Sequence, residues 1–445
     1  MCSFTITNKD IPLESTNHFA QKRGPDSTSV EKVNGISFLH NLLHLTGDKV
    51  HQPIIEDDLV CVLNGEIYNY QQFGNFDSDV QCIIPLYKEF GFEFAKKLDG
   101  EFSICMVDFK KSRLMLFNDT FATKPLWWCV EDGEIGVATY ESALLELGFK
   151  QPKKIPANTR MLIGFDQNTR QYIIEETGSL FTFNLDQTKD SFDDWNEAFA
   201  NSIRKRTENC REKIFIGLSS GYDSGSIACE LRNQDVPHTA YTLTGTENRE
   251  VLNARHDLFR GDSTHKVYTL PEHERGSIVN YIAKNVEPFK NTIHSSSSDY
   301  DEYHMDIVDD HGGGSLAYVC DHALRDGNKV YLSGSGADEI FSDYGFGGVK
   351  KYQHSNFGGL FPDDLETIFP WASFYGSSQE TYIAKEEHVA GSFGIETRYP
   401  YLDKYVVQEF LSLTPELKNS KYKSVLFNYL TQNNYPFCEN EKIGF

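Results

Sequence analysis

The chain has 445 residues, of which 39% are hydrophobic and 13% aromatic, so it can fill two or three folded domains and is not a disordered chain. Its 42 basic and 65 acidic residues give a net charge of -23, which disfavours nucleic acid and anionic membranes as partners. We expect a cytoplasmic protein with free thiols, since there is no 18-residue apolar run, no secretion signal and no C-x-x-C pair among nine scattered cysteines.

Short apolar segments separated by turns fill the first part of the chain. They predict strands at 59–63, 103–109, 114–117, 135–139, 161–165 and 171–176, with one helix at 80–91 that ends in glycine. From about residue 196 the order changes to strand, loop, helix and strand. Strands are predicted at 214–218, 239–244 and 329–334 and a helix at 226–234, which is typical of a parallel α/β sheet. We therefore expect domains at 1–176 and 196–445 with a polar linker at 177–195.

Two loops rich in serine and glycine follow strands of the predicted parallel sheet. The first is 219-SSGYDS-224, which opens a helix, and the second is 333-SGSGADE-339. Small residues let backbone N–H groups approach an anion, and the helix N-terminus adds partial positive charge. Asp223 would repel a phosphate unless a divalent cation bridges them. Two such loops at one edge of a sheet favour a nucleotide polyphosphate with Mg²⁺.

These motifs resemble those of a known family. The S-S-G-Y-D-S loop is similar to the pyrophosphate loop of the PP-loop ATP pyrophosphatases, and with LSGSGADE and 394-GIETRYPYLD-403 it resembles the synthetase domain of glutamine-hydrolysing asparagine synthetases. Cys2, 23-RGPD-26, 63-LNGEIYN-69 and 118-NDTFATKPLWW-128 look like the class II glutamine amidotransferase domain. The resemblance implies an αββα N-terminal nucleophile sandwich followed by an α/β parallel-sheet PP-loop domain.

In the first domain the resemblance implies a glutamine-hydrolysing site. Cys2 would be the nucleophile, and its own α-amino group would be the base once Met1 is removed. Asn64 and the Gly65 N–H would stabilise the oxyanion, while Glu66 and Asp79 would hold the glutamine amino group. Without the resemblance, Asn64-Gly65 between two β segments would predict a hairpin turn.

In the second domain the resemblance implies that ATP activates a carboxylate as an acyl-adenylate, which ammonia then attacks. Three groups of residues are implied: Leu218, Thr242, Ser333 and Gly334 at the adenosine; Ser219, Ser220, Gly221, Asp223 and Ser224 at the pyrophosphate; Asp223 and Asp338 at Mg²⁺. Glu287 would lie near the phosphates and the acceptor, and Lys442 would contact the activated acyl-phosphate region.

Three positions depart from the family pattern. Leu42 replaces an arginine that pairs with the glutamine α-carboxylate, and the loss of such a bond costs roughly 1.5–3 kcal/mol. Ser335 replaces the acid/base glutamate of the second loop, and a serine hydroxyl cannot accept a proton unaided at pH 7. Asp343 replaces a glycine at the acceptor end, which favours an acceptor bearing a cation. An acidic insertion around 299–315 is expected to form a solvated lid.

The sequence therefore predicts an ATP-dependent amidotransferase with glutamine or ammonia as donor, a small carboxylate as acceptor, and a homodimer as one possible assembly. Aspartate is the default acceptor. Two alternatives stay open: an enzyme that amidates a different carboxylate, and a catalytically impaired homologue that binds nucleotide.

Overall fold

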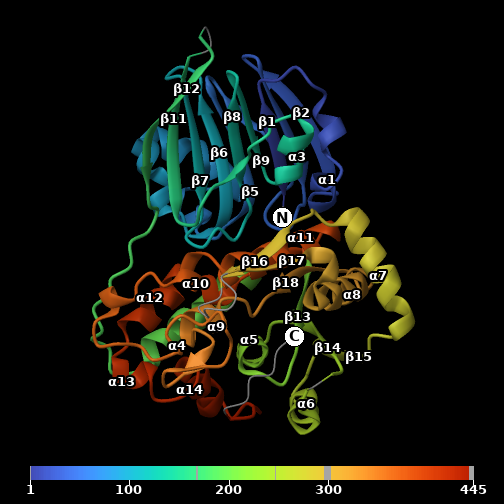
Figure 1. Cartoon of the computed structure of the whole chain (residues 1–445), viewed down its shortest axis with the longest axis vertical. Coiled ribbons are helices and arrows are strands. Elements are labelled where there is room, and N and C mark those ends of the chain that lie inside the picture. Colours follow the sequence, from blue (N-terminus) through green and yellow to red (C-terminus); the bar gives the residue numbers. More distant parts are fainter. Residues whose placement is uncertain (1, 167–168, 246, 295–301, 440–445) are drawn as a thin grey trace.

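The first domain is a sandwich of two antiparallel sheets (Figure 1) in a computed structural model that describes residues 2–166, 169–245, 247–294 and 302–439. One sheet has the order β10 (Lys153–Lys154), β8 (Trp127–Glu131), β9 (Glu134–Ala138), β1 (Ser3–Thr7), β3 (Ile36–Leu42), β2 (Ser27–Val33). The other has the order β12 (Gln171–Gly178), β11 (Thr159–Asp166), β7 (Arg113–Asn118), β6 (Gly100–Asp108), β5 (Leu59–Ile67), β4 (Ile54–Glu56).

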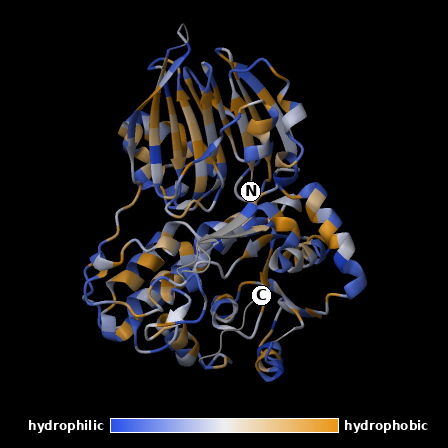
Figure 2. Ribbon diagram, in the orientation of Figure 1, coloured by the Kyte–Doolittle hydropathy of each residue, from blue (hydrophilic) through white to orange (hydrophobic). Residues whose placement is uncertain are grey.

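Helices cover both outer faces of this sandwich. Phe4 and Phe38 of the first sheet meet Val62 of the second in the central layer. The helix α2 (Ile83–Phe90) packs on the outer face of the second sheet, and α3 (Glu141–Glu146) packs on the outer face of the first. All nine residues of β5 are buried because both of its faces are covered. The predicted αββα architecture is confirmed, and Figure 2 shows the hydrophobic residues gathered along its strands.

The second domain is built on a five-stranded parallel sheet. Its order is β15 (Thr264–Tyr268), β14 (His238–Leu243), β13 (Lys213–Gly217), β18 (Asn328–Leu332), β21 (Glu396–Arg398). One face packs against α4 (Asp193–Thr207), α5 (Tyr222–Asn233), α12 (Lys404–Ser412) and α14 (Ser424–Gln432). The other face packs against α7 (Glu272–Asn285), α8 (His311–Arg325) and α11 (Ser378–Ser392). The predicted parallel α/β sheet is confirmed.

Shorter elements complete the described chain. They include α1 (Ala20–Arg23), α6 (Arg249–His256), α9 (Ala337–Phe341), α10 (Ala372–Tyr375), α13 (Pro415–Lys418) and the hairpins β16–β17 (Lys290–His294, Glu302–Asp306) and β19–β20 (Gly345–Phe346, Val349–Lys350). All nine cysteines are free thiols. In the described ranges, no helix combines the length and the apolar character needed to cross a membrane.

A buried network of charges joins the two domains beside α11, which lies along their boundary near the N-terminal end of the chain (Figure 1). The Glu387 carboxylate on α11 forms ion pairs with Arg23 Nη2 at 2.8 Å and with Lys124 Nζ at 2.9 Å, and both cations belong to the first domain. The side chains of these three residues are fully buried. A second buried pair links Arg206 of α4 with Glu101 of β6 at 2.8 Å.

We expect Glu387→Ala to lower the free energy of unfolding by about 3–5 kcal/mol, because it leaves the buried Arg23 without its carboxylate and Lys124 with only the longer 3.6 Å contact to Glu101. Urea denaturation measures the change. The matched control is Asp48→Ala, which removes an interdomain ion pair with Arg211 whose side chains are 69% and 55% exposed and should cost at most about 1 kcal/mol. Equal losses of unfolding free energy in the two variants would contradict the proposed contribution of Glu387 to stability.

Candidate active sites

Cys2 lies at the start of β1, directly against the middle of β5. Its backbone N–H donates to Asn64 Oδ1 at 3.2 Å, and its thiol lies 3.9 Å from the Leu43 carbonyl oxygen. Burial raises the pKa of the Cys2 thiol to about 11, so the thiol is neutral at pH 7 and needs a base to become a nucleophile. The structure thus brings Cys2 and Asn64 together, as the sequence predicts.

Gly65 lies inside β5 rather than in a hairpin turn. It pairs with Phe102 of β6, and its φ of +126° belongs to a region that side chains rarely adopt. A Cβ at this position would lie 1.9 Å from the Glu101 carbonyl oxygen, so only glycine allows the two strands to approach here. The hairpin reading of Asn64-Gly65 is therefore wrong.

Two buried carboxylates lie beyond Gly65. Asp79 accepts hydrogen bonds from the backbone N–H groups of Ile67 at 2.9 Å and Val80 at 2.8 Å, while Glu66 lies 3.6 Å from Arg398 Nη2. Burial raises the pKa of Glu66 to about 8 and that of Asp79 to about 6. An α-ammonium group placed here would favour the ionised forms of both carboxylates.

The second domain places residues beside these carboxylates that the sequence alone does not identify. Arg398 is buried, donates Nε to Glu396 at 2.7 Å, and its Nη2 has no hydrogen-bond partner within the described chain. The backbone of residues 210 and 211 pairs with the segment after β3, through a bridge between Cys210 and Thr46 and a 3.0 Å bond from Arg211 N–H to the Leu45 carbonyl. Arg398 lies in the GIETRYPYLD motif, which was quoted for the resemblance but given no role.

The first predicted anion loop joins β13 to α5. Within it the Ser219 and Ser224 hydroxyls are 2.9 Å apart, and the Gly221 N–H donates to Ser219 Oγ at 3.1 Å. The Arg255 guanidinium group holds the loop in place by donating hydrogen bonds to the carbonyl oxygens of Ser219 and Gly221. The Ser220 N–H and hydroxyl both donate to the Glu247 carboxylate at 2.5 Å. A carboxylate thus occupies this loop, which supports its capacity to hold an anion.

The second loop follows β18, the neighbour of β13, and meets the first. A Cβ on Gly334 would lie 3.1 Å from Asp223 Cβ, so the bare glycine permits the contact between the loops. The Ser333 N–H donates to the Arg398 carbonyl at 2.9 Å. At the adjoining strand end, Thr242 Oγ1 donates to the Leu218 carbonyl at 2.5 Å. The two loops share one edge of the sheet, as predicted from their motifs.

A lysine joins the two aspartates that the resemblance assigns to Mg²⁺. Lys423 Nζ lies 2.6 Å from Asp223 Oδ1 and 2.8 Å from Asp338 Oδ1. Burial lowers the pKa of Lys423, but the two carboxylates outweigh burial and raise this pKa well above its ordinary value. Both aspartates therefore already converge on one cation, and carboxylate oxygens are the ligands that Mg²⁺ prefers, so the pair fits the implied metal.

Two residues predicted for the acceptor pocket are placed elsewhere. Glu287 is buried against the first domain, where its carboxylate accepts from the Ser142 N–H at 3.0 Å and the Ser142 hydroxyl at 2.5 Å, at the start of α3. Asp343 is fully buried and receives hydrogen bonds from four residues of its own loop, Ser355, Asn356, Phe357 and Gly358. Both carboxylates are used to hold local structure. Lys442 lies outside the described residues.

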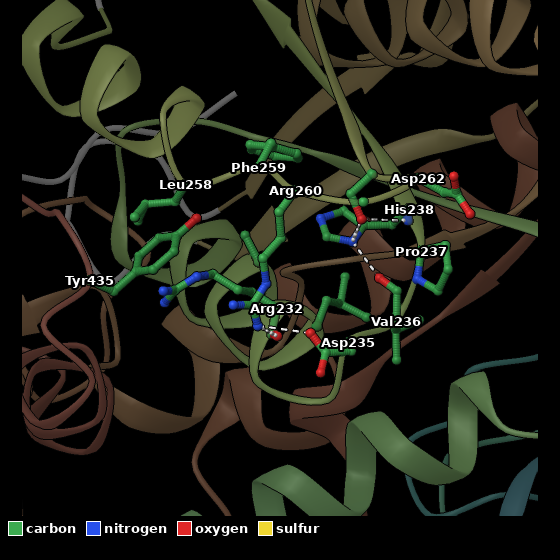
Figure 3. Close-up of a pocket in the computed structure, with 14 residues that line it drawn as sticks. Arg232, Asp235, Val236, Pro237, His238, Leu258, Phe259, Arg260, Asp262 and Tyr435 are labelled. Carbon is green, nitrogen blue, oxygen red and sulfur yellow. Dashed lines mark hydrogen bonds and ion pairs between the residues drawn. The ribbon is translucent and has the colours of Figure 1, made fainter.

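A separate pocket opens at the other end of the parallel sheet, where the strands begin (Figure 3). Its lining includes His238 at the start of β14, Phe259, Arg260 and Tyr435, and none of the predicted site residues. The His238 Nδ1 atom lies 2.9 Å from the Val236 carbonyl. Because the serine and glycine loops follow the carboxyl ends of the strands, this pocket is distinct from the two predicted anion loops.

Comparisons with known proteins agree with this organisation. Residues 1–180 match the family model of the glutamine amidotransferase domain, and residues 194–368 match that of asparagine synthase. The chain belongs to the family of glutamine-hydrolysing asparagine synthetases, glutamine-dependent ligases that combine these two domains.

Individual relatives are distant. A putative asparagine synthetase 1 of Methanocaldococcus jannaschii is 29% identical over 88% of this chain and 72% of its own length. Asparagine synthetase B of Escherichia coli is 23% identical over 89% of this chain and 71% of its own length. Among solved structures, a glutamine phosphoribosylpyrophosphate amidotransferase of B. subtilis is 12% identical, with a TM-score of 0.35 over 60% of this chain and 81% of that one, too distant to bear on the fold.

Proposed function

We propose that the chain adenylates a small carboxylate with ATP and amidates it with ammonia released from glutamine. The observation that carries the proposal is the convergence of Asp223 and Asp338 on Lys423, at the meeting point of two loops that suit a polyphosphate. Mg²⁺, when bound there, would neutralise the phosphates. In the first domain, Cys2 beside Asn64 and Gly65 supports glutamine hydrolysis.

The residues divide this chemistry between two places. Cys2 would attack the glutamine amide, and the Asn64 side-chain amide with the Gly65 N–H would stabilise the oxyanion. Glu66 and Asp79 would hold the glutamine α-ammonium group. In the second domain the N–H groups and hydroxyls of residues 219–224 would surround the pyrophosphate, and Thr242 and Ser333 would lie at the adenosine.

Pyrophosphate release from ATP tests the proposal, measured with ammonium chloride and a panel of carboxylic acids. Aspartate is the first acid on the panel because it is the family's default acceptor. Release with aspartate and an equal amount of asparagine supports an asparagine synthetase, and release with another acid alone supports an amide-forming enzyme of different specificity. Nucleotide binding without release for any acid would contradict the proposed activity.

We expect Leu42→Arg to lower the KM for glutamine by about 10-fold or more, since it restores a cation for the α-carboxylate. Arg398 does not replace that cation, because its charge is shared between Glu396 and Glu66. The KM for glutamine is measured at saturating ATP. Leu42→Met, of similar size and without charge, is the matched control and should leave it unchanged. An unchanged KM in the arginine variant would show that position 42 does not face the glutamine carboxylate.

A further inference from the structure

Glu386 on α11 is a carboxylate that no motif of the chain points to, and it lies beside the loop position that has lost its glutamate. The side chains of Ser333 and Ser335 lie close to the Glu386 carboxylate and favour its ionised form. Its Oε2 atom is buried and has no hydrogen-bond partner among the residues that the structure describes. A buried carboxylate oxygen without a partner is costly, so such an atom calls for a functional explanation.

The arrangement places a carboxylate where the family's loop glutamate would act. Ser335 stands at the position of that glutamate, and Glu386 approaches it from another element, the helix α11. We propose that Glu386 accepts the proton from the attacking nitrogen when the acyl-adenylate is converted to the amide. The inference rests on the proposed function, since it concerns the second step of that reaction.

The step balances as follows. The lone pair of ammonia forms a bond to the acyl carbon, and the carbonyl π electrons move to oxygen. One N–H proton passes to Glu386, directly or through the Ser335 hydroxyl. The carbonyl then reforms, the bond from the acyl carbon to the phosphate oxygen breaks, and AMP leaves with that electron pair. Only the base is new, since ammonia and ATP are already part of the proposed reaction.

The surroundings of Glu386 suit a base that works near neutrality. Burial raises its pKa to about 7, although the two serine hydroxyls lower it. The charged and titratable groups that face it are Lys385 and Glu387 on its own helix, Tyr331 on β18, Cys320 on α8 and Tyr399 after β21. Its helix neighbours have opposite effects on the pKa, because Lys385 lowers it and Glu387 raises it. A carboxylate with such a pKa can take a proton from nitrogen and release it again.

The test separates the two steps of the reaction in Glu386→Gln. ATP–pyrophosphate exchange, with the panel acid that releases most pyrophosphate, reports adenylation, and amide formation at saturating ammonium chloride reports the second step. We expect exchange to persist and amide formation to fall by about 10²- to 10⁴-fold. In the parent protein, amide formation should rise with pH through about 7, as the carboxylate ionises, and this rise should disappear in the variant.

A rescue and a control distinguish a base from a structural residue. Adding Ser335→Glu to the Glu386→Gln variant returns a carboxylate from the other side of the pocket and should restore amide formation and its pH dependence. Glu380→Gln, on the same helix with a side chain 48% exposed, should change neither step. Glutamine keeps the shape of the side chain, so the Glu386→Gln variant should fold. If it does not, Glu386→Asp, which keeps a carboxylate on a shorter side chain, can be measured in its place.

Amide formation at the parent rate in Glu386→Gln would overturn the inference and leave the proposed function standing, because pyrophosphate release would be intact. Loss of exchange together with amide formation would also overturn it, since Glu386 would then serve adenylation or folding. A parent protein that releases no pyrophosphate with any acid would overturn the proposed function, and the inference with it.

Discussion

Cys2→Ala should abolish amide formation with glutamine and leave amide formation with ammonium chloride unchanged. The thiol is the nucleophile of the proposed glutamine site, whereas ATP and the acceptor would bind in the other domain, at the ends of β13 and β18. Burial raises the pKa of the Cys2 thiol to about 11, so a base must take its proton before the thiol can attack the amide. Product is measured with each nitrogen donor at saturating ATP.

Cys210→Ala provides the matched control for this result. Cys210 comes from the second domain, bridges to Thr46, lies near Glu66 and Arg398, and carries a thiol whose pKa is also raised by burial. Its loss should leave glutamine use intact, because Cys210 contacts the first domain through its backbone bridge to Thr46 and its thiol has no role in the proposed reaction. If Cys2→Ala reduced the rate equally with both donors, the division of the chemistry between two sites would be wrong.

The fold was readable from the sequence where the pattern was continuous. The strands β5, β6, β7 and β11 of the second sheet and the three central strands of the parallel sheet were predicted close to their observed bounds, because they are largely buried and form apolar runs. The exposed edge strand β12 was predicted from its apolar pair Ile173 and Ile174, whereas the short edge strand β4 was missed. Strands β2 and β3 were missed. In β2 polar residues such as Glu31 and Lys32 predominate at the sheet edge, and in β3 His40 and Asn41 are buried through hydrogen bonds that no periodicity reveals.

The site was readable where a motif is short and local. The loops 219–224 and 333–338 and the segment 64–66 each hold their predicted site residues within a few positions, and the strand order places the two loops at one edge of the parallel sheet. The roles of these residues stay predictions. Glu287 and Asp343 were misplaced because the partners that bind them, Ser142 and the loop at 355–358, are distant or without a recognisable pattern. Arg398, Glu386 and Lys423 come from segments far along the chain, so only tertiary structure joins them to their sites.

Lys423→Met should reduce ATP–pyrophosphate exchange by about 10²- to 10³-fold and leave glutamine hydrolysis by the first domain intact. Lys423 contacts both of the loops proposed to bind the nucleotide, through Asp223 and Asp338. In the protein without ligand its ammonium group neutralises these carboxylates. With ATP and Mg²⁺ present the aspartates can serve the metal, which leaves the ammonium group to offset the charge that develops on the phosphates.

Two comparisons separate this role from a merely structural one. Lys421→Met removes an exposed lysine two residues away and should leave exchange unchanged. Lys423→Arg keeps the charge that the aspartates require and should retain the fold. If both Lys423 variants lose exchange while the melting temperature of the arginine variant is unchanged, the lysine acts on the phosphates and not only on the fold. Lys423→Met should also gain thermal stability from Mg²⁺ alone, because the partly exposed carboxylates of Asp223 and Asp338 then lack the lysine cation. Normal exchange in Lys423→Met would show that this lysine has no role in adenylation. The charge of Asp223 and Asp338 would then have to be balanced by another group.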